Sequence, residues 1–161
     1  MPTTDTNLGW ALTSLLRDYL RQVDDRLEEL PGGSRSYMMM SAIASDSCHS
    51  QVALAERLGL DRTTVTYLLD GLEGQDLVRR TPDPADRRVR HVNLTVQGNA
   101  TLKRLARSVD EVEARVLARL SEAELSQFRG LLGKAAGLPP QADVTTMCQA
   151  AMEAKDYLEA R

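Results

Sequence analysis

The apolar residues of the N-terminal segment recur at steps of three and four, which is the spacing of one face of an α-helix. The sequence 31–33, Pro-Gly-Gly, is expected to end this helix because both residue types disfavour its continuation. A second helix is predicted after a cap at Ser34 or Ser36, and the polar stretch 45–49 is predicted to be a loop. The stripe of the first helix consists of Leu8, Leu12, Leu15, Leu16, Tyr19, Val23, Leu27 and Leu30.

Two short helices joined by a turn are predicted in the middle of the chain. Ser50 is an N-cap candidate for the first, residues 51–58, and Gly59 follows where a helix end favours left-handed φ. Asp61 is the cap candidate for the second, which runs from residue 62 to about residue 73. This arrangement is typical of the helix-turn-helix motif. The expected buried residues are Ala53, Leu54 and Leu58 in the first helix and Val65, Leu68, Leu69 and Leu72 in the second.

The hydrophobic period changes from helical to alternating after Gly74. Residues 77–80 and 88–94 are therefore predicted to be strands. The connection 81–86 contains two prolines and two aspartates, which favour turns. Together these segments predict a β-hairpin, or wing, with a basic tip.

The C-terminal part of the chain is predicted to be helical. Thr95 is the N-cap candidate of a helix whose apolar residues form a seam suited to a partner helix. Ser121 and Glu124 form a capping-box pattern that opens a further helix ending near residues 137–140, and a last helix is predicted over roughly 144–157. The seam consists of Leu102, Leu105, Val109, Val112, Val116 and Leu120.

Composition narrows the class of protein. The chain has 161 residues, of which 42% are apolar and 4% aromatic, so one domain with an aliphatic core is expected. The N-terminus lacks the pattern of a secretory signal, and no stretch approaches the ~20 apolar residues of a membrane span, so a cytoplasmic location is expected. The two cysteines and two histidines lack the spacing of a disulfide framework or a zinc site, so no metal or other cofactor is expected.

Charge is distributed unevenly along the chain. The formal net charge is −3, but residues 77–94 carry five arginines and two aspartates, a net charge of +3. A local basic patch is typical of a surface that binds phosphate groups. A solvated charged hairpin would show the same composition, so charge alone leaves both interpretations open.

The second helix of the helix-turn-helix has an outward face of a kind that can contact DNA. With Val65 inward, a projection at 100° per residue directs Thr63, Tyr67 and Asp70 away from the core. Threonine can bond bases or phosphates, arginine can reach guanine or phosphate, and tyrosine can do either or stack. An ordinary exposed face is the alternative, but threonine is a poor helix former and therefore needs another reason to be there. The flanking residues are Arg62, Thr64 and Thr66.

The tip of the wing carries Asp86, Arg87 and Arg88, and Arg90 follows in the second strand. A guanidinium group is thin and always charged, so it can enter a narrow minor groove, and a neighbouring carboxylate can orient it. The alternative is a surface ion pair of little energetic value.

Residues from about 50 to 98 resemble the MarR family of winged helix-turn-helix regulators, and the flanking helices are similar in layout over roughly 8–137. Two departures stand out: position 67 is Tyr where the family often has a basic residue, and position 76 is Asp where it usually has Gly. The matching runs are Leu-Ala-Glu-Arg-Leu-Gly-Leu-Asp-Arg-Thr-Thr-Val-Thr (54–66), Leu-Val-Arg-Arg (77–80), Pro-Asp-Pro-Ala-Asp-Arg-Arg (82–88) and Leu-Thr-Val-Gln-Gly (94–98).

The resemblance implies a dimer with two winged lobes on double-stranded DNA. Arg88 would lie in the minor groove with Asp86 steadying it, and Ser50 and Gln51 would approach phosphate at a helix N-terminus. The recognition helix would present Arg62, Thr63, Thr64 and Thr66. At position 76, Asp tolerates left-handed φ better than most residues, so the turn is expected to persist.

The resemblance also implies a chemical signal. Family members often bind small aromatic or phenolic anions in a cleft between the dimer helices and the DNA-binding lobe, although each candidate residue here also fits an ordinary core. A thiol switch at Cys48, beside His49, is an alternative. An enzyme built on that pair lacks an orienting third group, and a winged helix used only for protein contacts is a further alternative. The candidate cleft residues are Trp10, Arg17, Tyr37, Met38 and Met40.

The sequence thus predicts a mainly α-helical protein with a small β-hairpin wing, a single domain over 1–161. Its DNA-binding lobe would cover 34–96, its dimerisation helices 5–30 and 97–137, and a tail, expected to be helical, 138–161. The expected function is a non-enzymatic regulator, a repressor, that binds a pseudo-palindromic operator as a homodimer and is released by a small molecule.

Overall fold

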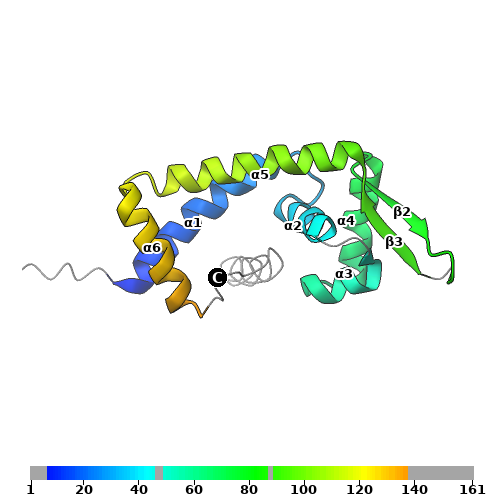
Figure 1. Ribbon diagram of the computed structural model, residues 1–161, viewed down its shortest axis with the longest axis horizontal. Helices are drawn as coiled ribbons and strands as arrows, with labels where there is room; N and C mark the ends of the chain where they lie inside the picture. The colour runs from blue at the N-terminus through cyan, green and yellow to red at the C-terminus, as the bar shows by residue number, and fades with distance from the viewer. Residues whose placement is uncertain (1–6, 46–48, 87–88, 138–161) are drawn as a thin grey trace, which may run out of the picture.

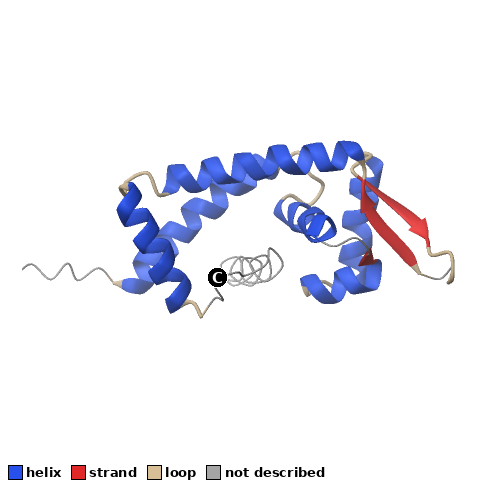
Figure 2. Cartoon of the chain, in the orientation of Figure 1, coloured by secondary structure: helices blue, strands red, loops and turns tan. Residues whose placement is uncertain are grey.

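The computed structural model describes residues 7–45, 49–86 and 89–137 (Figures 1 and 2). The fold is mainly helical with one small antiparallel sheet, as the sequence predicts. Within these residues no helix is long and apolar enough to cross a membrane. The elements are α1 (Leu8–Leu27), α2 (Ser34–Ser45), β1 (His49–Ser50), α3 (Gln51–Leu58), α4 (Arg62–Gly74), β2 (Val78–Pro82), β3 (Arg90–Leu94), α5 (Val96–Val116) and α6 (Glu122–Ala135).

The molecule is elongated, and α5 runs along its length (Figure 1). At one end α5 meets the hairpin and the helices α2, α3 and α4, which form the winged lobe. At the other end lie α6 and the beginning of α1. One long helix therefore connects the winged lobe to the opposite end of the molecule.

The predicted apolar seam of α5 has a partner within the same chain. Leu105 and Val112 are fully buried, and α5 packs along α1, whose Val23 and Leu27 are buried. The sequence shows that such a seam needs a partner but does not say which helix supplies it. Leu120, the last residue predicted for the seam, lies beyond the end of α5.

The core of the winged lobe includes the residues that face inward from α3 and α4, together with Met39, Met40 and Ile43 of α2. All four residues predicted for α4 are buried, whereas α3 buries Ala55 in place of the predicted Ala53, which is exposed. The turn between the helices has Gly59 at φ 64°, the left-handed conformation predicted for it. The helix-turn-helix is therefore packed on an aliphatic core that it shares with α1, α2, the hairpin and α5, and the outer face of α4 stays exposed.

The sheet contains a strand that the sequence analysis did not predict. Its order is β1-β3-β2, and His49, assigned to a loop from sequence, pairs with Val92 in β3. In the hairpin, Val78 pairs with Leu94 and Pro82 with Arg90. A two-residue strand is too short to produce an alternating pattern, so it cannot be recognised before its neighbour is placed.

The joint between the hairpin and α5 is tight. Asp76 has φ 56°, so the aspartate does adopt the left-handed turn conformation. The Thr95 hydroxyl donates to the Asp76 carbonyl at 2.6 Å, and the Thr95 amide donates to the Leu77 carbonyl at 3.1 Å. Gly98 lies so close to Leu77, the residue before β2, that an added Cβ would be 1.9 Å from the Leu77 carbonyl oxygen. The start of α5 is therefore fixed to the base of the wing.

Candidate nucleic-acid interface

Local caps set the start of both helices of the helix-turn-helix. The Ser50 hydroxyl accepts a hydrogen bond from the Ala53 amide at 3.1 Å, and Asp61 accepts from the Thr64 amide at 2.9 Å. The hydrogen bonds from Thr64, side chain first, lower the pKa of the Asp61 carboxyl. Asp61 therefore adds an ionised cap, which a helix N-terminus favours.

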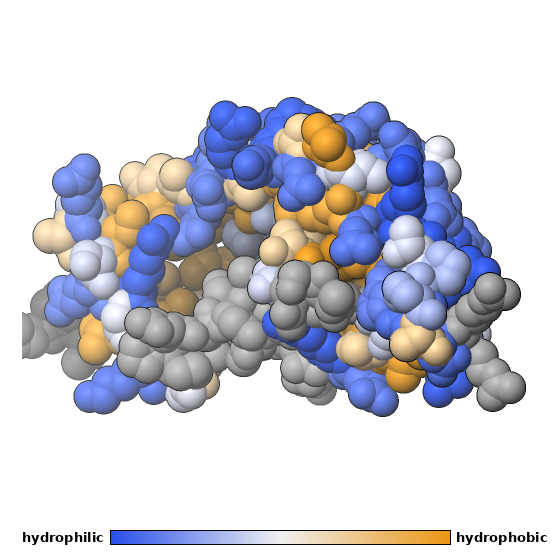
Figure 3. Space-filling model, turned by 45° about the vertical axis from the view of Figure 1, so that its right-hand side comes forward, coloured by the Kyte–Doolittle hydropathy of each residue, from blue (hydrophilic) through white to orange (hydrophobic). Residues whose placement is uncertain are grey.

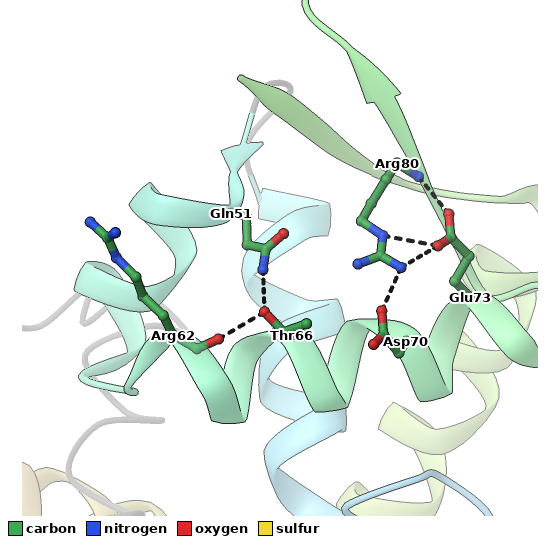
Figure 4. A network of polar contacts seen from close by, with 6 residues as sticks. All are labelled: Gln51, Arg62, Thr66, Asp70, Glu73 and Arg80. Carbon is green, nitrogen blue, oxygen red and sulfur yellow. Dashed lines mark hydrogen bonds and ion pairs between the residues drawn. The ribbon is translucent and has the colours of Figure 1, made fainter. Parts of the chain in front are cut away.

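The outer face of α4 is oriented as the helical projection predicts. Thr63, Tyr67 and Asp70 are exposed, and Tyr67 retains 67% of its accessible surface. Arg62 is also exposed and points away from its neighbours (Figure 4). A basic, a hydroxyl and an aromatic side chain thus stand on one face of a firmly packed helix.

The hydroxyl groups of Thr64 and Thr66 are used within the lobe. Thr64 Oγ1 donates to Asp61 Oδ2 at 2.5 Å, and Thr66 Oγ1 donates to the Arg62 carbonyl at 2.9 Å. Thr66 Oγ1 also accepts from Gln51 Nε2 at 2.6 Å (Figure 4). Gln51, predicted to approach phosphate, therefore ties the first turn of α3 to the middle of α4.

Arg80 connects the wing to the other end of α4. Its Nη2 lies 2.6 Å from Asp70 Oδ1 and 2.5 Å from Glu73 Oε2 (Figure 4). The Glu73 carboxylate also accepts from the Arg80 amide at 3.0 Å. The hydrogen bond from the Arg80 side chain is the main cause that lowers the pKa of Glu73. Gln51 and Arg80 thus hold α4 from two sides.

The pairing of Arg80 changes the interpretation of the basic patch. Its side chain is only 17% exposed and faces two carboxylates, so Arg80 does not add a free positive charge to the wing. Arg79, by comparison, is exposed and forms only a 3.7 Å contact with Asp76. The sequence-based count of five arginines therefore overstates the charge that the wing presents.

The wing loop is described only in part. Asp86 and Arg90 are exposed, whereas Arg87 and Arg88 lie outside the described residues. The loop is closed by hydrogen bonds from the Asp83 amide to the Val89 carbonyl and from the Val89 amide to the Asp86 carbonyl, each 2.9 Å. These two bonds close the base of the loop, and the minor-groove role of Arg88 stays a prediction.

The residues predicted for an effector cleft are not gathered into one site. Trp10 is 82% exposed near the start of α1, whereas Met38 and Met40 are buried in the lobe and Tyr37 packs against its core. Arg17 lines a groove of about 930 Å³ between α1, the end of α5 and α6, which contains none of the other four. Met40 in particular is an ordinary core residue.

Some residues of interest escaped the sequence analysis. Val52 is exposed on the first turn of α3. Its position outside the buried stripe of that helix is the one sign in the sequence that it would face outward. The partners of Arg80 and a contact between His91 and Asp83 could not be predicted, since they join residues of different elements. Cys48, the candidate thiol switch, lies outside the described residues.

Comparisons with known proteins agree with this geometry. The MarR family model matches residues 34–89. The transcriptional regulator HosA of Escherichia coli O111:H- is 37% identical over 121 residues, which are 74% of this chain and 90% of the relative. A mutant of MarR from E. coli, solved in complex with operator DNA, is 25% identical with a TM-score of 0.61, and the match covers 80% of this chain and 92% of that one.

A second solved structure contains a bound ligand. The PcaV transcriptional regulator from Streptomyces coelicolor, in complex with its natural ligand, is 25% identical with a TM-score of 0.61, and the match covers 82% of this chain and 93% of that one. The family model falls on the winged lobe, and the HosA match extends well beyond it along the chain. On these grounds the chain belongs to the MarR family.

Proposed function

We propose that the chain is a DNA-binding transcriptional regulator that binds a pseudo-palindromic operator as a homodimer. The observation that carries this proposal is the outer face of α4, where Arg62, Thr63 and Tyr67 are exposed. The helix itself is held in place by the Asp61 cap and by contacts with Gln51 and Arg80. A recognition helix needs such support because base contacts depend on its exact placement in the major groove.

The remaining contacts follow from the same placement. The capped N-terminus of α3, with Ser50 and the exposed Val52, would lie against the DNA backbone, where helix dipoles favour phosphate. The proposed wing contacts are Arg87, Arg88 and Arg90, with Asp86 orienting Arg88. Because the Thr64 and Thr66 hydroxyls donate within the lobe, we expect these residues to offer methyl groups and acceptor lone pairs rather than donors.

Dimerisation would use the end of the molecule opposite the wing. Leu8, Trp10 and Leu12 on α1 and Leu131 and Leu132 on α6 are exposed apolar residues. Apolar side chains are visible at the surface of this end, on the left of Figure 3. Exposed apolar residues that gather at one end of a molecule favour an interface between copies. A two-fold dimer would place two recognition helices about 34 Å apart, one turn of DNA.

A small molecule would release the operator, so that the protein acts as a repressor. PcaV, which is similar in fold and sequence, is known with a natural ligand. A ligand that binds one spacing of the two lobes better than the other shifts the population between them by its differential affinity. Arg17, which lines the groove between α1 and α6, is the predicted residue that best suits an anionic ligand.

The test is a fluorescence-anisotropy titration against the DNA upstream of the protein's own gene, with a scrambled duplex as control. We expect tight binding to the upstream DNA alone, weakened by roughly 10³-fold or more as salt rises, since several phosphates are neutralised. Arg62→Ala should weaken this binding, whereas Arg107→Ala, an exposed arginine in the middle of α5, should not. Equal, weak binding to both duplexes would contradict a sequence-specific role.

A further inference from the structure

A histidine and an aspartate meet at the base of the wing and take no part in the interface described above. His91 lies in β3, and its Nε2 is 2.6 Å from Oδ2 of Asp83, the first residue after β2. Each side chain is 24% exposed. The contact is therefore partly shielded from water and links the central strand to the start of the wing loop.

Asp83 is the residue on which the base of that loop depends. Its Oδ1 accepts from the Ala85 amide at 2.6 Å and from the Asp86 amide at 3.0 Å, while its own amide donates to the Val89 carbonyl. The hydrogen bond from His91 is the largest of the causes that lower the pKa of Asp83, so the carboxylate is ionised at neutral pH. The imidazole holds Oδ2 of this carboxylate, and Oδ1 holds the loop through its hydrogen bonds with the Ala85 and Asp86 amides.

The other ring nitrogen of His91, Nδ1, indicates that this residue does more than fill space in the lobe. Nδ1 is buried and has no hydrogen-bond partner among the described residues. Leaving a buried polar atom unpaired costs free energy, and an apolar side chain at this position would avoid that cost. The arrangement implies that Nε2 carries the proton donated to Asp83, and that this contact is what the histidine provides.

The position of His91 connects the loop to the helix-turn-helix. In the sheet it pairs with Thr81 on β2 and with Ser50 on β1. Ser50 is the cap of α3. One residue of the central strand thus lies beside the start of α3 and, through Asp83, holds the wing loop.

We propose that His91 is a positioning residue that, through Asp83, sets the orientation of the wing relative to the helix-turn-helix and thereby the affinity for the operator. Neither side chain needs to touch DNA. The proposal rests on the proposed function, because it assumes that the wing contributes to operator binding.

The test separates stability from affinity. His91→Leu removes the donor and also the unpaired Nδ1, so the thermal midpoint should stay level or rise while operator affinity falls by about tenfold. His91→Gln, which can still donate to Asp83, should recover part of the affinity. A role in stability alone would lower the midpoint and leave the affinity of the folded protein unchanged. Asn93→Leu, two residues along the same strand face, is the matched control and should bind as the unmodified protein does.

A second measurement does not depend on DNA. Amide hydrogen exchange at Ala85 and Asp86 should be faster in His91→Leu and in Asp83→Ala, and unchanged in Asn93→Leu. Unchanged exchange together with unchanged operator affinity in His91→Leu would overturn the proposal. If the unmodified protein binds no operator, the proposed function fails, and exchange alone then shows whether His91 holds the loop.

Discussion

Arg80 illustrates how a single side chain couples two parts of the winged lobe. It reaches from β2 to two carboxylates on α4, and it is the less exposed of two neighbouring arginines. Removing it would leave Asp70 and Glu73 without the guanidinium group that both carboxylates contact. The side chain thus holds the wing against α4 and is not available to a phosphate group.

Arg80→Ala should lower the free energy of unfolding by about 1–2 kcal/mol, since charged hydrogen bonds are lost but the carboxylates can be rehydrated. Arg79→Ala removes an exposed pair and should cost less than about 0.5 kcal/mol. Urea unfolding followed by circular dichroism compares the two. Equal losses would show that the Arg80 network contributes no more than an ordinary surface pair.

Gly98→Ala should be strongly destabilising, because the added Cβ would lie 1.9 Å from the Leu77 carbonyl oxygen, a backbone atom that cannot move alone. A loss of about 2 kcal/mol or more is expected from such overpacking. Gly74→Ala, at the end of α4 with nothing within 4 Å of the added Cβ, should be neutral or slightly stabilising. Thermal unfolding of both variants tests whether Gly98→Ala lowers the thermal midpoint while Gly74→Ala leaves it level or raises it.

Within helices and strands, what could be predicted from sequence depends on the distance between partners along the chain. The caps at Ser50, Asp61 and Ser121 join atoms three residues apart, and the structure has each of them where the pattern indicates. Asp70 and Arg80 are ten residues apart and meet only through the register of the hairpin. Periodicity describes one element at a time, so it gives the faces of helices but not the contacts between elements.

Acid should destabilise the winged lobe through its carboxylates. Hydrogen bonds lower the pKa values of Glu73, Asp83 and Asp61, so each contributes stability that is complete above its unfolded pKa, about 4, and is lost as pH falls through its lowered folded pKa. The thermal midpoint should therefore be steady between about pH 7 and 5 and fall below about pH 4.

Glu73→Gln identifies one source of this dependence. The variant should have a lower midpoint at pH 7 and a smaller further drop at pH 3, because it has already lost the Glu73 carboxylate, one of the two that Arg80 contacts. Glu28→Gln, at the exposed end of α1, should follow the unmodified protein at both values. An acid drop of the same size in Glu73→Gln would exclude Glu73 as a contributor.

In the whole molecule, the surface proposed to bind DNA and the apolar surface proposed for dimerisation lie at opposite ends. The outer face of α4 lies in the lobe, and the exposed apolar residues of α1 and α6 lie at the far end of α5 (Figure 1). The sequence predicted both sets of helices. It could not show that the α5 seam is satisfied by α1 of the same chain, since an apolar stripe does not identify its partner.

Leu131→Glu should convert a dimer into monomers, because Leu131 is 60% exposed on α6 and a buried carboxylate would oppose association. Operator affinity should fall on the order of 10²-fold or more as the two half-sites lose their linkage. Val96→Glu, at an 89% exposed apolar residue on the lobe, should remain dimeric. Light scattering after size exclusion gives the mass. A dimeric Leu131→Glu would place the interface elsewhere.

The uninterrupted length of α5 has a mechanical consequence. Its 21 residues span about 30 Å at 1.5 Å each, and the Thr95–Leu77 joint couples its first turn to the wing. If such a helix tilts as a rigid body by about 10° about one end, its other end moves by about 5 Å. In the proposed dimer, a rotation of about 10° where the two copies meet would therefore change the spacing of the two winged lobes relative to the ~34 Å repeat of DNA, with every bond inside each lobe unchanged.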